Sequence, residues 1–87
     1  MYVIIVYDVS VEKVSKVCQF LRMFLSWIQN SVFEGEISES ELLKIEKGLK
    51  EIIDKEKDCV IIYKLDSEKR LERRFVGIRK TMTTNII

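Results

Sequence analysis

The chain has 87 residues, of which 47% are hydrophobic and 33% charged, and its formal net charge is +1. This composition indicates one globular domain over residues 1–87 and excludes a disordered chain, and no apolar run approaches the roughly 20 residues that cross a membrane. We therefore expect a cytoplasmic protein without a membrane partner. The chain has no histidine, which excludes imidazole catalysis and imidazole-bound metals and leaves hard cations held by oxygen ligands.

The first element that we expect is a strand over Tyr2–Tyr7, where no polar side chain other than the tyrosine hydroxyls interrupts the apolar residues. Such a strand is typically covered on both faces, so it should lie centrally in a sheet. Asp8 follows it directly, and a rigid strand that ends in a carboxylate is a common support for a metal or phosphate site. The alternative is that Asp8 only ends the strand and stabilises the turn.

Ser10 is the expected N-cap of a helix that ends near Phe24. Apolar residues at spacings of three and four predict that one side of this helix is buried. These residues are Val11, Val14, Cys18, Leu21 and Leu25. Lys13 and Lys16 lie off that side, where they either remain solvated or contact a phosphate.

Residues 27–37 have the composition of extended structure, and Gln29–Ser31 can break them into two short strands. Gly35 marks either a β-bulge or a close approach of the backbone. A second helix should begin after Ser38, which forms a capping box with Glu41 three residues later. The expected buried side of this helix consists of Leu42, Ile45, Leu49 and Ile52.

Cys59–Leu65 is expected to be a second central strand, because it again has few polar positions. A last short strand should cover Glu72–Ile78, followed by a C-terminal tail over residues 79–87. Residues 59–87 carry seven basic and three acidic side chains, and the basic ones either follow the backbone of a nucleic acid or remain solvated. The basic residues concerned are Lys69, Arg70, Arg73, Arg74, Arg79 and Lys80, and the last four are the expected phosphate contacts of a DNA-binding dimer.

The order of these elements predicts an α+β, ferredoxin-like βαββαβ fold with an added C-terminal strand. Two helices cover only one face of such a sheet, yet both strands that we place centrally are apolar on both faces. The other face would then expose a larger apolar patch than monomers usually do. We expect a second copy, or its exchanged C-terminal strand, to cover this face in a two-fold homodimer.

Two segments then indicate a family. Tyr7–Ser10 (YDVS) closes the first strand, and Gln29–Gly35 (QNSVFEG) follows the first helix. With these motifs at this spacing, the chain closely resembles the CRISPR-associated protein 2 family, the small partner of the CRISPR integrase in spacer acquisition. The resemblance implies a homodimer in which the C-terminal strand of one subunit joins the sheet of the other.

The resemblance also implies a metal site. In that site the Asp8 carboxylates of the two subunits lie near each other across the two-fold axis and share one Mg²⁺ or Mn²⁺ ion. The family residues near it correspond to Tyr7, Ser10, Ser31 and Phe33. Such an ion typically takes one or two carboxylates together with phosphate oxygens of a nucleic acid.

Several functions remain open. One is a CRISPR adaptation subunit with metal-dependent endonuclease activity on single-stranded RNA or double-stranded DNA, in which Asp8 is the catalytic metal ligand. Another is a non-catalytic, DNA-binding dimer that bridges integrase subunits and in which Asp8 is vestigial. Further alternatives are a ribonuclease toxin of the virulence-associated type and a ferredoxin-like module that binds neither nucleic acid nor metal.

Overall fold

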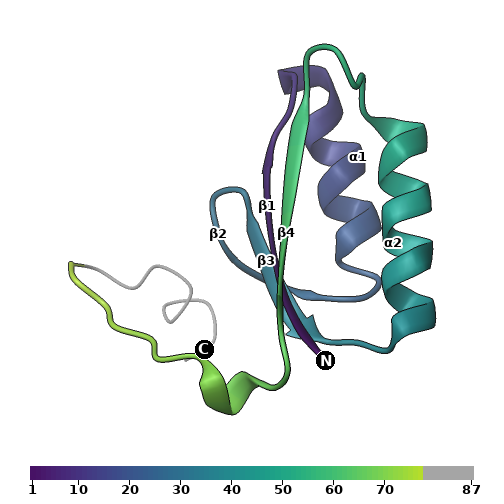
Figure 1. Ribbon diagram of the computed structural model, residues 1–87. Coiled ribbons are helices and arrows are strands. Elements are labelled where there is room, and N and C mark those ends of the chain that lie inside the picture. The colour runs from purple at the N-terminus through teal and green to yellow at the C-terminus, as the bar shows by residue number, and fades with distance from the viewer. Residues whose placement is uncertain (78–87) are drawn as a thin grey trace.

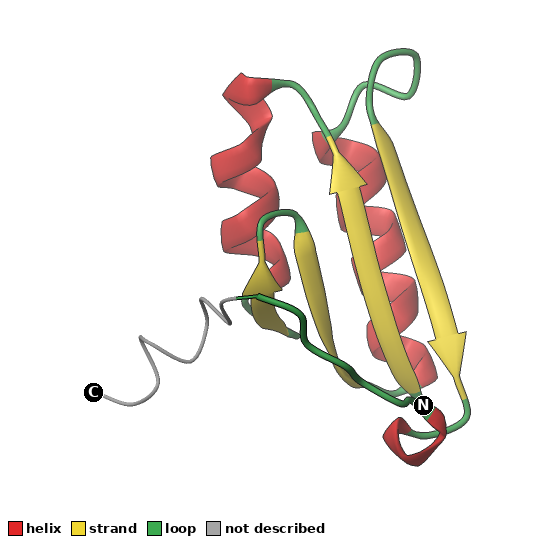
Figure 2. Ribbon diagram, turned by 90° about the vertical axis from the view of Figure 1, so that its left-hand side faces the viewer, coloured by secondary structure: helices red, strands yellow, loops and turns green. Residues whose placement is uncertain are grey.

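The computed structural model of the chain describes residues 1–77, which form an antiparallel sheet with helices packed on one of its faces (Figure 1, Figure 2). In chain order, the elements are β1 (Tyr2–Asp8), α1 (Val11–Leu21), β2 (Ser26–Gln29), β3 (Val32–Glu36), α2 (Glu39–Ile52), β4 (Cys59–Leu65) and a short 3-10 helix (Glu68–Arg70). This order confirms the ferredoxin-like α+β prediction. Among residues 1–77, no helix has the length and apolar character needed to span a bilayer.

β1 lies inside the sheet, whose strand order is β2-β3-β1-β4. It pairs with β3 on one side and with β4 along its whole length on the other, from Tyr2 opposite Leu65 to Asp8 opposite Cys59. The central position predicted for this strand is therefore confirmed. β4, in contrast, is an edge strand within this sheet, so the prediction that it is central is wrong for the single chain.

Along each strand, successive side chains point to opposite faces of the sheet. Val3, Ile5 and Tyr7 of β1 are buried under the helices, so Ile4 and Val6 point to the opposite side. We call this side the open face. Through the strand register it also carries Val32, Ile61 and Tyr63. Ile61 and Tyr63 are 45% and 52% exposed, so β4 is apolar on both sides because one side packs under α2 and the other belongs to the open face.

The predicted buried stripe of α1 is confirmed only in its second half, where Leu21 and Leu25 are buried and Cys18 is partly buried. Val17 and Leu21 are fully buried, whereas Val11 is 88% exposed and Val14 is 39% exposed. The apolar positions of this segment supply two overlapping stripes, and only the stripe that contains Val17 faces the sheet and α2. The helix also ends at Leu21 and not near Phe24, because residues 22–24 form a turn.

α2 begins with the predicted capping box. The Ser38 hydroxyl accepts a hydrogen bond from the Glu41 amide, and the Ser38 amide donates one to the Glu41 side chain at 2.9 Å. Leu42, Ile45 and Leu49 are buried as predicted, and Ile52 is partly buried against the same core.

The break within residues 27–37 lies at Asn30 and Ser31, which separate β2 from β3. Asn30 has a φ of 45°, a conformation that asparagine tolerates better than most residues. A Cβ atom at Gly35 would lie 3.1 Å from Leu25 Cδ2, so of the two predictions for Gly35 the close approach is confirmed. The irregular register belongs to β2, between Trp27 and Gln29.

After the 3-10 helix the chain turns back across the open face, where Figure 2 shows it passing in front of the strands. Arg73, Phe75 and Val76 line a recess there of about 360 Å³ with Ile4 and Val32.

Residues 72–77 pair with no strand of their own chain. Over residues 72–77 the expected strand Glu72–Ile78 is thus not formed within the single chain, and its pairing with a second copy stays a prediction. Ile78 and the tail over residues 79–87, including Arg79 and Lys80, lie outside the described residues.

Candidate metal and nucleic-acid site

Asp8 is the last residue of β1 and is exposed to solvent. The alternation along β1 places its side chain on the open face, in line with Val6 and Ile4. Within residues 1–77 there is no group of three or more Asp, Glu or Cys side chains that could hold a metal ion. Residues 1–77 therefore hold no complete metal site made of side chains alone, and an ion at Asp8 would need further oxygen ligands from solvent, a substrate or a second copy.

The turn that follows Asp8 is held by a buried carboxylate, Asp58, which immediately precedes β4. Asp58 accepts hydrogen bonds from the Ser10 amide and hydroxyl, both at 2.9 Å, and from the Asp54 amide at 2.8 Å. Asp58 also forms an ion pair with the Lys13 ammonium group at 3.0 Å. Because Asp8 lies opposite Cys59 in the β1–β4 ladder, the contacts of Asp58 tie the turn after Asp8 to the start of the paired strand β4.

These contacts change the roles that the sequence suggests for two residues. Ser10 occupies the N-cap position of α1, but its side chain makes no capping bond, because the hydroxyl donates to Asp58. Lys13 is paired and not simply solvated. Hydrogen bonds from the Asp54 amide, Lys13 and Ser10 lower the pKa of the Asp58 carboxyl, and burial raises it. The hydrogen bonds outweigh burial, so this pKa lies well below its ordinary value.

Tyr7 and Phe33 lie behind Asp8, on the side of the sheet that the helices cover. Both are buried, and their ring centroids are 6.2 Å apart. The Tyr7 hydroxyl lies 2.8 Å from Cys18 Sγ, and burial, assisted by this contact, raises the pKa of Tyr7 to about 12. Ser31 accepts a hydrogen bond from the Tyr7 amide through its carbonyl oxygen at 3.1 Å. Tyr7 and Phe33 therefore support the end of β1 from the core side, and Ser31 holds it through a backbone hydrogen bond from the β2–β3 turn.

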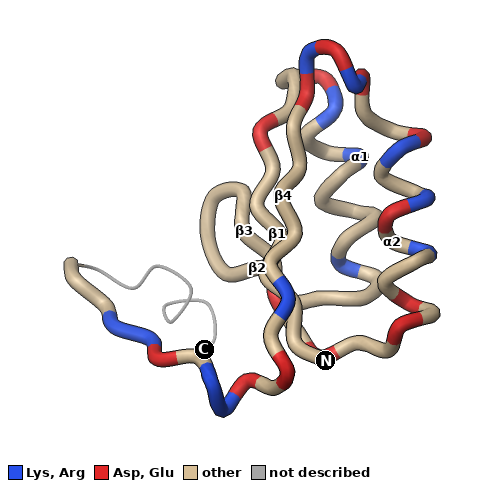
Figure 3. The backbone as a smooth tube through the Cα atoms, viewed as in Figure 1, with Lys and Arg blue, Asp and Glu red and all other residues tan. Residues whose placement is uncertain are grey.

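The predicted basic residues that lie within residues 1–77 do not form one surface. Lys16 is exposed on α1, while Arg74 is exposed and pairs with Glu72 at 3.2 Å. Figure 3 shows that basic and acidic residues alternate along α2 and the C-terminal segment, whereas the strands are nearly free of charge. Arg73, in contrast, is taken up by an internal ion pair.

That ion pair involves Glu34, whose side chain is only 4% exposed although it lies on the open face. Arg73 donates hydrogen bonds to both oxygens of Glu34, and the Tyr2 hydroxyl donates to Oε2 at 2.5 Å. Burial alone would raise the pKa of Glu34, but the hydrogen bonds from Arg73 and Tyr2 and the charge of Arg73 lower it below its ordinary value. Glu34 belongs to the Gln29–Gly35 motif, but the sequence of that motif does not indicate an ion pair with Arg73.

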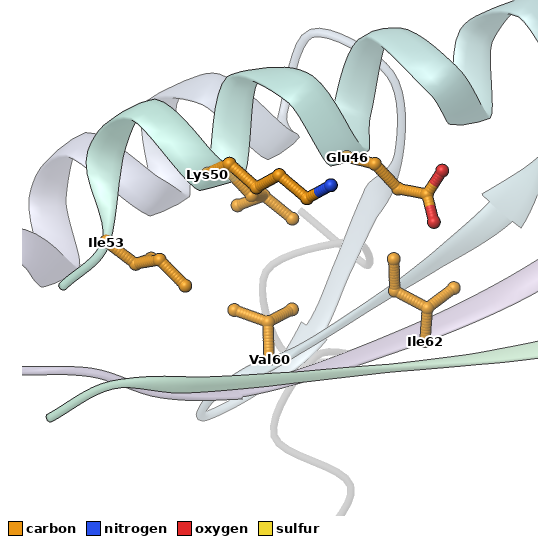
Figure 4. A pocket seen from close by; sticks show the side chains of 6 residues that line it. Glu46, Lys50, Ile53, Val60 and Ile62 are labelled. Carbon is orange, nitrogen blue, oxygen red and sulfur yellow. The ribbon is translucent and has the colours of Figure 1, made fainter. Parts of the chain in front are cut away.

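A separate groove lies between α2 and β4 (Figure 4). It has a volume of about 220 Å³ and is lined by Ile53, Val60 and Ile62, with Glu46 and Lys50 of α2 at its side. Because Asp8 is not among its lining residues, this groove is distinct from the candidate metal site.

Comparisons with known proteins agree with the fold and the motifs. The family described as "CRISPR associated protein Cas2" matches residues 1–73. The CRISPR-associated endoribonuclease Cas2 of Pyrococcus furiosus is 54% identical over 87 residues, which is 100% of both chains. The protein of the same name from Methanosarcina acetivorans is 51% identical, again over 100% of both chains.

Solved structures with a similar fold also include Cas2 proteins. A Cas2 crystal structure matches with a TM-score of 0.86 and 46% identity, covering 93% of this chain and 91% of that one. Streptococcus pyogenes Cas2 matches with a TM-score of 0.73 and 29% identity, covering 86% of this chain and all of the other. From its sequence, its fold and these matches, the chain belongs to the Cas2 family of CRISPR-associated proteins.

Proposed function

We propose that this protein is a metal-dependent endoribonuclease that works as a homodimer, with Asp8 of each subunit as the metal-binding carboxylate. The observation that carries the proposal is the position of Asp8, an exposed acid at the end of the central strand, on the face that no helix covers. The names of the relatives from Pyrococcus furiosus and Methanosarcina acetivorans, both endoribonucleases, support the reaction class.

The homodimer follows from the open face. Ile4, Val6 and Val32 are only partly buried there, and Ile61 and Tyr63 are about half exposed. Exposed apolar side chains that lie side by side on one face favour association. A two-fold axis near the end of β1 would add a second Asp8 to the one ligand that each chain supplies.

The donor chemistry of this position fits a hard cation. Mg²⁺ and Mn²⁺ prefer carboxylate and phosphate oxygens, and they commonly use one or two protein carboxylates while they keep several waters. A bound ion of this kind activates water and stabilises charge on the phosphate. The role of the chain is to hold the carboxylates rigidly, through the β1–β4 ladder and the Asp58 contacts that fix the turn after Asp8.

A second role is a structural one in CRISPR adaptation, as a DNA-binding dimer that bridges integrase subunits. It is favoured by the exposed basic side chains of Lys16, Lys69 and Arg70, which are suited to phosphate contacts without base specificity. The two roles are compatible, since DNA binding needs these cations and cleavage needs Asp8.

The test compares wild type, Asp8→Asn and Asp66→Asn on single-stranded RNA and on duplex DNA, with and without Mg²⁺. Asp66→Asn is the matched control, because Asp66 is 88% exposed and follows β4 at the opposite end of the sheet from Asp8. We expect Mg²⁺-dependent RNA cleavage by wild type and Asp66→Asn, and a loss of about 100-fold or more in Asp8→Asn. Equal cleavage by Asp8→Asn and wild type would exclude Asp8 from the mechanism.

The oligomeric state is measured on the same samples by light scattering. We expect a species of twice the 10.3 kDa chain mass. A species of 10.3 kDa at micromolar concentration would contradict the homodimer.

A further inference from the structure

We propose that Ser10 and Asp58 are positioning residues for Asp8, and that they set how tightly this carboxylate binds a divalent cation without contacting the ion themselves. This inference rests on the metal-binding role proposed above for Asp8, and it names the contacts on which that role depends. We call the hydrogen-bonded pair of Ser10 and Asp58 the turn clamp.

Asp8 lies where the sheet supports β1 from one side only. On the β3 side, the last backbone contact is the hydrogen bond from the Tyr7 amide to the Ser31 carbonyl, one residue before Asp8. In the part of the chain that the structure describes, Asp8 is therefore paired only with Cys59 of β4. The direction of the exposed Asp8 side chain consequently depends on the start of β4 and on the turn that follows β1.

The start of β4 and this turn are attached to the same carboxylate. Asp58 directly precedes Cys59, and its Oδ1 atom accepts hydrogen bonds from the amide and the hydroxyl of Ser10, both at 2.9 Å. Ser10 follows Asp8 by two residues, and the intervening Val9 packs against the hydrophobic core. The turn clamp thus joins the chain after Asp8 to the chain before Cys59 across 48 positions of sequence.

The second oxygen of Asp58 holds this carboxylate in place. Its Oδ2 atom accepts hydrogen bonds from the Lys13 ammonium group at 3.0 Å and from the Asp54 amide at 2.8 Å. The Asp58 side chain is only 1% exposed, and a buried carboxylate is unfavourable unless its partners satisfy it. With donors at both oxygens, the carboxylate has little freedom to move, so Ser10 is attached to a fixed point.

A purely structural interpretation is the alternative, in which Asp58 only stabilises the start of α1. A carboxylate near a helix N-terminus does so through the helix dipole, and both interpretations then predict that loss of the clamp destabilises the fold. They differ in metal affinity. A ligand that is held in place beforehand loses less conformational entropy on binding, and residues that orient metal ligands typically contribute about 10–100-fold to the affinity.

The experiment is a Mn²⁺ titration of the full-length chain followed by electron paramagnetic resonance, at a temperature at which circular dichroism shows every variant folded. The proteins compared are wild type, Asp8→Asn, Ser10→Ala, Asp58→Asn and Ser38→Ala. Ser38→Ala is the matched control, because it also removes an N-cap hydroxyl that takes part in a hydrogen bond. Ser38 follows the end of β3 that pairs with the start of β1, so it is remote from Asp8.

Asp58→Asn affects the Ser10 side of the clamp for a chemical reason. The introduced amide group brings two N–H donors, whereas the Lys13 ammonium group and the Asp54 and Ser10 amides are themselves donors. Of these partners only the Ser10 hydroxyl can also accept a hydrogen bond. The new NH₂ group therefore faces Ser10, and the Ser10 amide loses its acceptor.

We expect Asp58→Asn to weaken Mn²⁺ binding about 10-fold and Ser10→Ala, which keeps the amide contact, to weaken it about 3-fold. Ser38→Ala should change it less than about 2-fold, although it also destabilises the fold. Wild-type affinity in both Ser10→Ala and Asp58→Asn would overturn the positioning role and leave the metal site at Asp8 intact. Equal weakening in Ser38→Ala would also overturn it, because lost stability alone would then explain the effect.

Asp8→Asn separates this inference from the proposed function. If Asp8→Asn binds Mn²⁺ as tightly as wild type, the ion is not held at Asp8, and the proposed metal site fails together with its positioning residues. Amide hydrogen exchange at Ser10 is a readout that does not involve the metal. We expect this exchange to accelerate on the order of 10-fold in Asp58→Asn and to stay unchanged in Ser38→Ala. Unchanged exchange in Asp58→Asn would contradict the turn clamp, and if this variant does not fold, Ser10→Ala and its control decide through the titration.

Discussion

Gly48 of α2 lies directly against the ring of Phe20 of α1, and we predict that Gly48→Ala destabilises the protein. A Cβ atom at this position would lie 2.1 Å from Phe20 Cζ and within 2.8 Å of two further ring atoms. Such distances are far below van der Waals contact, so the Phe20 ring has to leave its place. The glycine thus permits the close contact between the two helices.

Three contributions set the size of the effect. Alanine in a helix interior is favoured over glycine by about 1 kcal/mol. Overpacking a well-packed contact costs about 1–3 kcal/mol. A displaced Phe20 also loses its edge-to-face contact with Phe24, at a centroid distance of 5.5 Å, which is worth about 0.5–1.5 kcal/mol. We therefore expect a net loss of about 1–3 kcal/mol, or a Tm lower by roughly 5–20 °C for a domain of this size.

The assay is thermal unfolding followed by circular dichroism at one protein concentration. In the Phe20→Ala background, Gly48→Ala should no longer destabilise and should show the propensity gain of about 1 kcal/mol. Lys47→Ala, an exposed change one residue away on the same helix, is the control and should stay within about 0.5 kcal/mol of wild type. A higher Tm for Gly48→Ala in the wild-type background would refute the reasoning.

Substitutions at four further positions test other contacts. Ser38→Ala removes the cap of α2 and should lower the free energy of unfolding by about 1 kcal/mol in urea titrations. Asn30→Gly should be nearly neutral, whereas Asn30→Val, which tolerates the φ of 45° poorly, should cost about 1–2 kcal/mol by the same measurement. Tyr2→Phe removes a hydrogen bond to a charged, buried group, so it should lower the free energy of unfolding by about 1.5–3 kcal/mol. A much smaller loss would contradict a stabilising role for this hydrogen bond. Because the pKa of Asp58 is lowered from its ordinary value of 3.8, this residue stabilises the fold above about pH 4 and loses that contribution as the pH falls further. Asp58→Asn should therefore be less stable than wild type at pH 7, and a gap that stays constant down to pH 2 would contradict this assignment.

The parts of the fold that the sequence predicts correctly depend on short-range patterns. β1 is recognised by its uninterrupted apolar run, and the capping box by two residues three positions apart. The position of Asp8 at the end of a strand is likewise predicted from the few residues that precede it. Each of these features is complete within a few residues, so the chain itself carries the information.

The features that the sequence analysis misses depend on contacts between distant segments. Lys13 and Asp58 are 45 residues apart, and Arg73 and Glu34 are 39 apart. Asp58 belongs to a run of alternating charges over residues 54–58. The sequence of such a run does not indicate whether one of its carboxylates is buried. In both pairs, a basic residue that we expected on the surface or at a phosphate is held within the fold by a buried acid.

The two errors of placement have a related cause. In α1 the apolar residues allow two stripes, and only tertiary packing selects the one with Val17. In β4 an apolar strand suggests neighbours on both edges, but the sheet ends there. Both patterns indicate that the apolar side chains are buried, but they do not indicate which neighbouring element covers them.

The position of β4 also affects how the protein behaves in solution. Its outer edge presents seven residues of backbone, Cys59–Leu65, without proline or glycine and with Lys64 as the sole charge, and within residues 1–77 no strand pairs with that edge. An edge of this kind is a template for indiscriminate strand addition and for aggregation. For the homodimer proposed above, we therefore expect resistance to aggregation to depend on assembly, so that substitutions that prevent assembly cause insolubility before they cause unfolding.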